Sequence, residues 1–480
     1  MSLPPPSVPL LLSTRSPYAL PPTRYLIPTS FTRFQLSQLI NTSLSLSPPV
    51  PFDFLVRGSL LRGSLQSWMT AHGQGGEETL EVEYVQSVLP PRREASIPQE
   101  DWVSAVSLSL PDHILSGAYD NTVRIYTEGQ ELLHTLSSHS GPITAVTAFP
   151  TPAQYAIGEG NIILSSSQDR TVHMHHLPSP SLLPTSASAA DAGPRLLTTL
   201  HTSPAQVSSV APSPSGQHIV TATWDGLLGL FTSTLPTSHE LPADDEPDIS
   251  RKKRRKLAPT SSAEETEVFR KAPTLLLRGH TSKVSRAIWD PDGLSIFSAG
   301  WDYTVRQWDA QTGQQGGVKT TPDRVHLTIG RMAGPAPLLA TGTSDRMVCM
   351  FDLRSSSSST VQLTLPHASP VQSLVPHPTA SHLLTTATLQ GVLQIWDLRA
   401  PRESLVRVMR EGGKCLCVDW RVRGAGLPSQ AGEGGEEGVW VAGGEDRQVQ
   451  VWRTVTGGGA RVERVGKQVV DKVNEEDAET

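Results

Sequence analysis

Cysteine, aromatic residues and long apolar runs are scarce in this 480-residue chain. The three cysteines are Cys349, Cys415 and Cys417. A single C-x-C pair without a second pair or a histidine cluster makes neither a zinc site nor a disulfide framework, which favours a reducing, intracellular compartment. No apolar run approaches the roughly 18 residues that a membrane span needs. No basic residue precedes "VPLLL" as a secretory signal would require.

Acidic residues are absent before Asp53, and Arg, Ser and Thr are frequent there, a composition also typical of mitochondrial transit peptides. The many prolines of that segment oppose the amphipathic helix of such a peptide. The formal net charge of −6 is small for the length, so any basic surface must be local. Glycine (38) and proline (40) are abundant instead, which favours many short strands joined by turns.

An internal repeat is the main feature that the chain does have. The stretch "SAGWDYTVRQWD" surrounds Asp302, and six similar stretches surround Asp120, Asp169, Asp225, Asp345, Gln390 and Asp446. Four residues before this reference position stands Ser or Thr in every copy except at Ala442. The third and fifth residues after the reference position are apolar in every copy, except for Gln307. The sixth residue after it is aromatic or His. This alternation predicts strand, tight turn and strand in each copy.

The spacings between reference positions are 49, 56, 77, 43, 45 and 56 residues, which suits a four-stranded propeller blade with insertions. With "GH" before the turn and "WD" after it, the copy around Asp302 resembles the WD-repeat family. The resemblance implies a buried, hydrogen-bonded set within the blade, made by His280, Ser298, Asp302 and Trp308. This convergence of Ser, His and Asp is expected to be structural and not a hydrolase triad. We therefore predict a mainly β fold with a seven-bladed propeller over residues 101–457.

Residues 1–92 lack the repeat and predict a small α+β domain of ubiquitin-like type. The stretch "FTRFQLSQLIN" has apolar residues at helical spacing after Thr29 and Ser30, two candidate N-caps. "VPLLLST", "TRYLIPT", "PFDFLVRG" and "TLEVEYV" read as strands, with "LLRGSLQSWM" as a short segment between the last two. The remaining segments are expected to be a linker at 93–100, a disordered basic insertion at about 235–270 and a tail at 458–480.

A head containing "PVPFDFLV", "LLRGSL" and "LEVEYV", followed by "DWVSAV" and WD-type copies, is similar to the WD-repeat ribosome-biogenesis proteins of the PeBoW complex. Their head is a Notchless-like ubiquitin-like domain. The resemblance implies a non-enzymatic assembly factor for the large ribosomal subunit, with no cofactor or metal of its own, in the nucleolus and nucleoplasm. It implies that the propeller binds a block-of-proliferation family protein, which holds pescadillo, and that the head recruits the ATPase midasin.

In that family a carboxylate of the head completes the coordination of a divalent ion in midasin's adhesion site. The resemblance places this role on Glu77 within "GQGGEET", with Glu78 as its competitor. An acidic side chain on a loop tip suits Mg²⁺, which prefers oxygen ligands. From the residues alone, a solvated turn is the favoured explanation of both glutamates.

Six consecutive cations interrupt the long interval between the third and fourth copies: Arg251, Lys252, Lys253, Arg254, Arg255 and Lys256. Acidic, Ser- and Pro-rich sequence surrounds them, which predicts a disordered surface loop. Such a run acts as a nuclear import signal or contacts rRNA phosphates, and solvated charge is the plain alternative. We expect an import signal, and direct rRNA contact stays open because no known RNA-binding motif accompanies the run.

A second functional hypothesis is a substrate receptor or adaptor of a ubiquitin ligase, in which the propeller reads a peptide and the head mimics ubiquitin. Against it, "LEVEYV" does not end in a diglycine tail. An enzyme is the third hypothesis and ranks last, because the sequence has no clustered nucleophile, metal set or nucleotide-binding loop. The propeller fold does not decide between these functions, since it hosts many of them.

Overall fold

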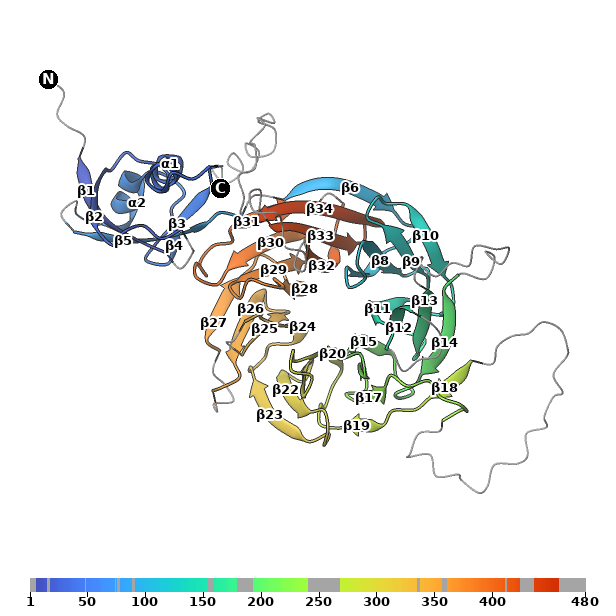
Figure 1. Cartoon of the computed structure of the whole chain (residues 1–480). Helices are drawn as coiled ribbons and strands as arrows, with labels where there is room; N and C mark the ends of the chain where they lie inside the picture. The colour runs from blue at the N-terminus through green and yellow to red at the C-terminus, as the bar shows by residue number, and fades with distance from the viewer. Residues whose placement is uncertain are drawn as a thin grey trace, which may run out of the picture.

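The computed structural model consists of a small α+β domain, the head, beside a ring of β-sheets (Figure 1). It describes residues 6–14, 18–47, 49–73, 75, 78–88, 91–152, 159–178, 193–240, 268–334, 337–355, 361–410, 412–423 and 436–456. Within these residues the chain is mainly β and has two helices, which confirms the predicted fold class. Neither of these two helices is long and apolar enough to cross a membrane.

The head is one five-stranded sheet with two helices. Its elements are β1 Ser7–Ser13, β2 Arg24–Pro28, α1 Arg33–Leu44, β3 Phe52–Val56, β4 Ser59–Leu60, α2 Leu65–His72 and β5 Leu80–Gln86. The strand order is β2-β1-β5-β3-β4, with β1 parallel to β5 and the other pairs antiparallel. Alternate residues of the strands point into one core, where Phe54 and Tyr84 meet Leu36 of α1 and Trp68 of α2.

Helix α2 lies in "LLRGSLQSWM", which the sequence predicted only as a short segment between two strands. The Ser64 hydroxyl accepts a hydrogen bond from the N–H of Ser67 at the start of the helix. At its end Gly73 adopts the left-handed conformation with a φ of 64°. These two caps enclose only eight residues, and the apolar contacts of Trp68 and Met69 with the head core hold the helix in place.

Helix α1 begins one turn later than the candidate caps Thr29 and Ser30 suggested. The side chain of Gln35 accepts the backbone N–H of Thr32 at 2.8 Å, so Thr32 is the N-cap. Thr29 is buried just before the helix, in the turn that follows β2.

Seven further sheets follow within the described residues, and we name them blades 1 to 7 in chain order. Blades 1 and 2 comprise β7 Val103–Ser107, β8 His113–Ala118, β9 Val123–Thr127 and β10 Leu132–Leu136, then β11 Ile143–Pro150, β12 Gly160–Ser167, β13 Val172–Pro178 and β14 Arg195–Leu200. Blades 3 and 4 comprise β15 Val207–Pro212, β16 His218–Thr223, β17 Leu228–Thr232 and β19 Leu275–Leu277, then β20 Val284–Trp289, β21 Ser295–Gly300, β22 Thr304–Asp309 and β23 Gln315–Thr320. Blades 5 and 6 comprise β24 His326–Arg331, β25 Leu338–Thr343, β26 Met347–Asp352 and β27 Leu363–Pro366, then β28 Val371–Pro376, β29 Leu383–Thr388, β30 Val392–Asp397 and β31 Val406–Met409. Blade 7 comprises β32 Cys415–Arg423, β33 Glu436–Gly444, β34 Gln448–Thr456 and β6 Arg92–Pro98.

The repeated aspartate marks the turn between the second and third strand of its blade. The residue after the reference position has a positive φ in all seven blades, namely Asn121, Arg170, Gly226, Tyr303, Arg346, Gly391 and Arg447. A tight hairpin needs this left-handed backbone. The Asp120 carboxylate shows how a non-glycine residue is held there: it accepts the N–H and the hydroxyl of Thr122 at 3.0 and 2.7 Å.

The innermost strands form a closed ring (Figure 1). Strands β7, β11, β15, β20, β24, β28 and β32 each contact the next, and β32 contacts β7 again. Hydroxyl groups on these strands join neighbouring blades. Three of them, on Ser104, Ser208 and Ser285, donate to backbone carbonyl oxygens of the following blade at 2.6 Å.

Strand β6 corrects the expectation of a linker at 93–100. It pairs with β34 from Pro98 opposite Gln448 to Arg92 opposite Arg453, so it is the outer strand of blade 7. Ile97 is buried in the apolar cluster between blades 7 and 1. The last three described strands, β32 to β34, supply only three strands of blade 7, and the segment before the first blade supplies its fourth.

Strand β18 Phe269–Lys271 overlaps the end of the expected insertion at 235–270 and runs parallel to β14 of blade 2 before the chain returns to blade 3. The Thr198 hydroxyl donates to the Phe269 carbonyl at 2.7 Å. The end of the expected insertion is therefore ordered. Residues 241–267, with the six cations, and the expected tail at 458–480 lie outside the described residues.

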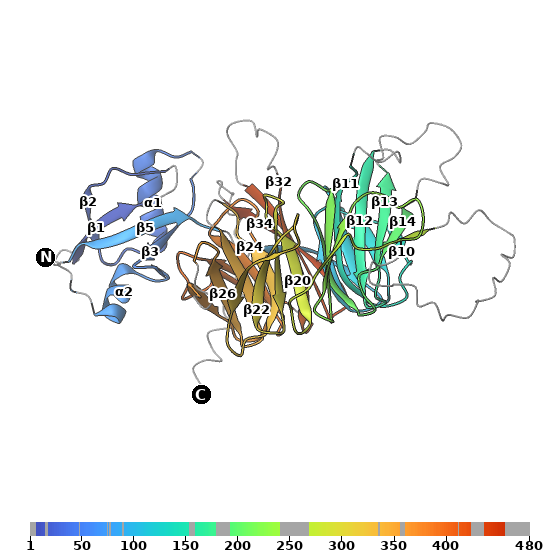
Figure 2. The same ribbon diagram turned by 90° about the horizontal axis from the view of Figure 1, so that it is seen from below.

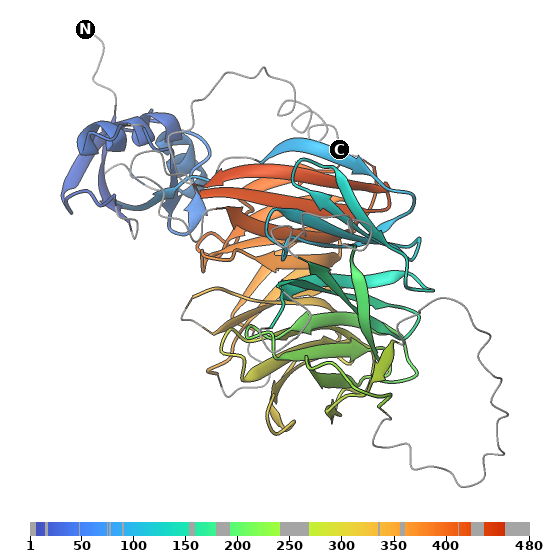
Figure 3. The same ribbon diagram turned by 45° about the vertical axis from the view of Figure 1, so that its right-hand side comes forward.

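The head lies at the rim of the disc beside blade 6, as the views in Figures 2 and 3 show. Leu55 of β3 and Val85 of β5 form an apolar cluster with Ala400, which follows β30. Next to this cluster, Arg62 of the head forms an ion pair with Glu403 at 3.0 Å. We call the blade 6 segment 398–405 the docking loop.

Strand β6 yields the first prediction. Replacement I97A should lower the free energy of unfolding by about 2–4 kcal/mol, because it empties a buried position between blades 7 and 1. The control is R92A on the same strand, an exposed position that should change stability by less than about 0.5 kcal/mol. Urea unfolding measures both. Equal stability of the two variants would contradict the pairing and favour a linker.

Candidate functional site

The acidic loop, residues 73–79, joins α2 to β5 and carries the predicted partner contact. Helix α2 ends at Gly73, which has a left-handed backbone, and β5 enters the core at Leu80. The imidazole of His72 stacks on the indole of Trp68 at 4.2 Å, which anchors the first end of the loop. All described residues of the loop, which are 73, 75, 78 and 79, are exposed.

Glu78 lies on this loop with 68% of its side chain exposed. Its carboxylate is 4.0 Å from the guanidinium of Arg57, in the turn between β3 and β4. Arg57 and Gly58 both have a positive φ, as a two-residue hairpin turn requires. Glu77 lies outside the described residues, so the choice between Glu77 and Glu78 stays a prediction.

The structure brings His280, Ser298, Asp302 and Trp308 of blade 4 together in one hydrogen-bonded chain. The Trp308 indole N–H donates to Ser298 Oγ at 2.8 Å, and Ser298 Oγ lies 2.8 Å from His280 Nε2. His280 Nδ1 lies 2.9 Å from Asp302 Oδ2. Because a carboxylate only accepts, Nδ1 carries the proton, and Nε2 therefore accepts from the serine hydroxyl.

This chain is a structural element and not a catalytic triad. The side chains of His280 and Asp302 are 0% and 3% exposed, so a substrate does not reach them. Burial would raise the pKa of Asp302, but hydrogen bonds from His280 and Thr304 outweigh it and hold that pKa well below its usual range. The carboxylate therefore stays ionised and ties the loop before β20 to the turn after β21.

Blades 2 and 6 contain partial versions of the set. In blade 2, His139 Nδ1 lies 2.9 Å from Asp169 Oδ2, and its Nε2 lies 2.9 Å from Ser165 Oγ, while His175 takes the tryptophan position. In blade 6, the Trp396 indole donates to His367 Nε2 at 3.1 Å. The set is therefore a repeated device that holds a blade together, and function must be sought elsewhere.

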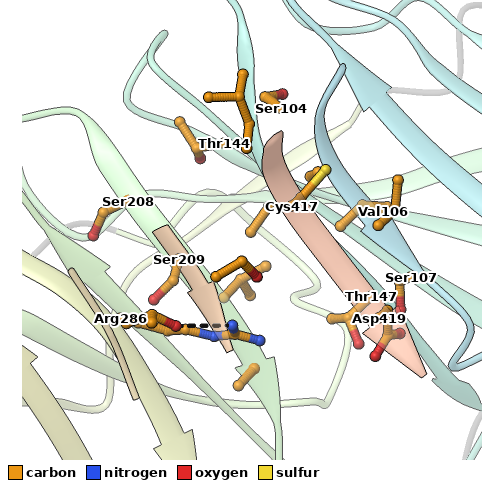
Figure 4. A pocket seen from close by; sticks show the side chains of 18 of the residues that line it. Ser104, Val106, Ser107, Thr144, Thr147, Ser208, Ser209, Arg286, Cys417 and Asp419 are labelled. Carbon is orange, nitrogen blue, oxygen red and sulfur yellow. Dashed lines mark hydrogen bonds between the residues drawn. The ribbon is translucent and has the colours of Figure 1, made fainter. Parts of the chain in front are cut away.

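The central channel is a second candidate site, because a cavity of about 370 Å³ extends along it (Figure 4). Its lining is rich in Ser and Thr and includes Arg286 and Asp419. Asp419 Oδ2 accepts the N–H of Leu108 at 2.7 Å, which joins blade 7 to blade 1. Arg286 donates to Thr328 Oγ1 at 3.4 Å, which joins blade 4 to blade 5. Both charged groups thus serve the seams between blades.

Two parts of the surface were missed by the reading of the sequence. Helix α2 had a detectable signal, since Ser64 and Gly73 stand where an N-cap and a C-cap belong. The docking loop had none, because the pairing of Arg62 with Glu403 joins residues more than 300 positions apart. Within the described residues, no group of three or more His, Cys, Asp or Glu is placed to hold a metal ion.

Two family models match the chain within these two modules. A model of the NLE (NUC135) domain matches residues 9–69 of the head. A model of the WD domain, G-beta repeat, matches residues 130–176, 194–231 and 271–309 of the ring. Fold and matches together define a WD-repeat protein with an NLE head.

Relatives extend this similarity over nearly the whole chain. Identity is 37% to the ribosome biogenesis protein YTM1 of Laccaria bicolor, covering 92% of this chain and 96% of the relative. It is 32% to the ribosome biogenesis protein WDR12 homolog of Chlamydomonas reinhardtii, covering 91% and 94%, and 30% to that of Arabidopsis thaliana, covering 84% and 90%. The chain therefore belongs to the YTM1/WDR12 family of ribosome biogenesis proteins.

The blade 4 set yields the second prediction. Replacement D302A should destabilise the ring by about 3 kcal/mol or more, because it leaves a buried histidine without its acceptor. The matched control is D225A: Asp225 has the same turn position in blade 3, is exposed, and accepts from Leu227 of its own turn. The control should cost about 1 kcal/mol or less. Similar losses for both variants in urea unfolding would refute a special role for the set.

Buried histidines yield the third prediction. Burial lowers the pKa of His173 to about 3 and those of His175, His201, His326, His367 and His377 to about 4. Below pH 6.5 these histidines bind protons in the unfolded chain but stay neutral in the folded chain. The free energy of unfolding therefore falls as the pH falls. Each ring shifted to about 4 contributes up to about 2 kcal/mol between pH 7 and pH 5, so we expect a loss of several kcal/mol over this range in urea unfolding. A flat profile over this range would contradict the burial of these rings.

Proposed function

We propose that this protein is a non-catalytic assembly factor for the large ribosomal subunit, acting in pre-rRNA processing and pre-ribosome maturation. The observation that carries the proposal is the match to ribosome biogenesis proteins across both modules, over 92% of the chain. The ring supplies a rigid platform for partner proteins, and the head supplies an exposed acidic loop. The blade 4 histidine and aspartate are buried and structural, which agrees with a factor that binds and does not catalyse.

The head recruits the midasin ATPase through its acidic loop, with Glu77 as the ligand to the partner's divalent ion and Glu78 as the competitor. Exposure of every described residue of the loop supports this role, since a ligand to a foreign metal must reach out of its own domain. The anchoring of the loop by α2 and β5 also limits the entropy lost on binding. ATP-driven pulling on this contact would strip the factor from the pre-ribosome.

The ring binds a block-of-proliferation family protein, and through it a pescadillo family protein, on the pre-ribosome. The six cations at 251–256 act as a nuclear import signal, which places the protein in the nucleus, the nucleolus and the nucleoplasm. Contact of the same cations with rRNA phosphates is an additional role that a salt-dependent RNA-binding assay would detect.

A ubiquitin-ligase adaptor is the alternative function. Opposing it, the chain after β5 continues into β6 and is fixed in blade 7, so the head has no free tail of the kind that conjugation uses. Affinity purification separates the two functions: large-subunit precursors with two constant companion proteins support the assembly factor, and cullin components support the adaptor.

The acidic loop yields the fourth prediction. Replacement E77A should abolish Mg²⁺-dependent binding to the midasin adhesion domain, because it removes one oxygen ligand of the ion. Binding to the block-of-proliferation propeller and the free energy of unfolding should not change. The matched control is E78A, which should weaken binding by less than about fivefold if its ion pair with Arg57 is its main contact. A pull-down with EDTA as a second control measures both, and the reverse pattern would transfer the role to Glu78.

A further inference from the structure

The turns at the seven reference positions lie on one face of the ring. In every blade the residue before the reference position donates its backbone N–H to the carbonyl oxygen of the residue that precedes the innermost strand. In blade 4, Trp301 donates to Lys283 at 2.8 Å, and in blade 7, Glu445 donates to Lys414 at 3.1 Å. These pairs therefore occupy equivalent points of the face, and their side chains can be compared from blade to blade.

Blades 3 and 4 carry exposed aromatic side chains on this face. Trp224, Trp301 and Tyr303 are 41%, 44% and 41% exposed. The two blades approach closely here, because a side chain at Gly226 would lie 2.7 Å from a backbone carbonyl oxygen of the loop before β20. That loop ends at Lys283, and we call these three aromatic residues and Lys283 the tryptophan–lysine patch.

The Lys283 ammonium lies between the two indoles of the patch. It is 3.8 Å from the ring centroid of Trp224 and 4.9 Å from that of Trp301. Burial lowers the pKa of Lys283, and no carboxylate of the described residues forms an ion pair with it. Cation–π contacts hold the ammonium in place but give its three N–H donors no oxygen acceptor. The charge is thus fixed and partly desolvated, and it has no anion beside it.

Blade 7 shows what the same position holds when the chain satisfies it. Lys414 forms an ion pair with Glu445 at 2.9 Å, and Glu445 stands where blade 4 has Trp301. The aspartates of the two neighbouring turns, Asp225 and Asp302, do not replace this partner, because each accepts hydrogen bonds within its own blade. Blade 4 therefore has the cation of the pair, with exposed aromatic surface in place of the carboxylate.

We propose that the tryptophan–lysine patch binds an acidic segment of a partner protein, with one Asp or Glu carboxylate paired to Lys283 and apolar neighbours packed on the indoles. This inference rests on the proposed role of the ring as a platform for partner proteins. Tryptophan and tyrosine around a paired charge are typical of the residues that dominate protein–protein binding. RNA would need open ring faces for its bases, and the ammonium already lies over both indoles.

Random short peptides displayed on phage, selected on the full-length chain, supply the probes. We expect the tightest peptides to share an Asp or Glu flanked by apolar residues. These peptides are then synthesised with a fluorescent label and titrated by anisotropy, beside a labelled short oligouridylate as the RNA probe. Urea unfolding of each variant checks that its fold is intact.

Two substitutions in the patch should weaken peptide binding. K283M keeps the apolar stem of the lysine and removes its charge, which should weaken the tightest peptide about tenfold or more. W301A removes one of the two indoles and should have an effect of similar size. The matched controls are K414M in blade 7 and W102A in blade 1, where Trp102 is 40% exposed on the same face. Both controls should bind within about twofold of the wild-type chain.

The carboxylate of the peptide gives a second readout. Its exchange for the amide should weaken binding to the wild-type chain about tenfold and leave binding to K283M unchanged, because the pair is already broken there. Selected peptides that all bind K283M as tightly as the wild-type chain would overturn the site. An oligouridylate that binds more tightly than every peptide, and only with Lys283 present, would overturn it in favour of RNA. Co-purification with large-subunit precursors tests the proposed function separately, since it does not depend on which surface of the ring binds.

Discussion

The ladder between β6 and β34 is the constraint on which the rest of the molecule depends. It joins the segment before the first blade to the last described strand and so ties the two ends of the ring together. Strand β6 begins at Arg92, six residues after β5 ends at Gln86. The same ladder therefore fixes the place where the head leaves the disc. The docking of the head on blade 6, its neighbour in the ring, is a consequence of this closure.

Buried polar groups that form hydrogen bonds with near neighbours hold each blade together and join it to the next. Blade 4 has the full chain from Trp308 to Asp302, and blades 2 and 6 have shorter versions. Across the seams, serine hydroxyls and the Asp419 carboxylate bind backbone groups of the next blade. A buried polar group costs free energy unless it is paired, so each of these contacts also selects one arrangement of neighbouring blades. The free energy of unfolding is also sensitive to acid, because burial lowers the pKa of His175 and His367 in these blades.

Prediction from the sequence succeeded where the signal is local and repeated. The turn at Asp302 was readable because apolar alternation, a tight turn and the aromatic residue fall within a few positions of one another and recur. It failed for short or unrepeated elements. Helix α2 has eight residues and little periodicity, and β6 offers only Ala95 and Ile97 as alternating apolar positions, beside two prolines at 90–91 that suggested a linker. The sequence located the exposed acidic loop of the candidate site, but it did not locate the docking loop of blade 6 that contacts the head.

The sequence by itself determined the hairpin unit, its repetition, the small α+β head, the residues of the blade 4 set and the family resemblance. These rest on contacts between residues close together in the chain or on recurrence of one pattern. Only the tertiary structure decided that β6 closes blade 7, that β18 pairs with blade 2 and that the docking loop covers Leu55 and Val85. Such contacts join distant segments, and they form only where ring closure brings matching surfaces together in space, which no local pattern of residues records.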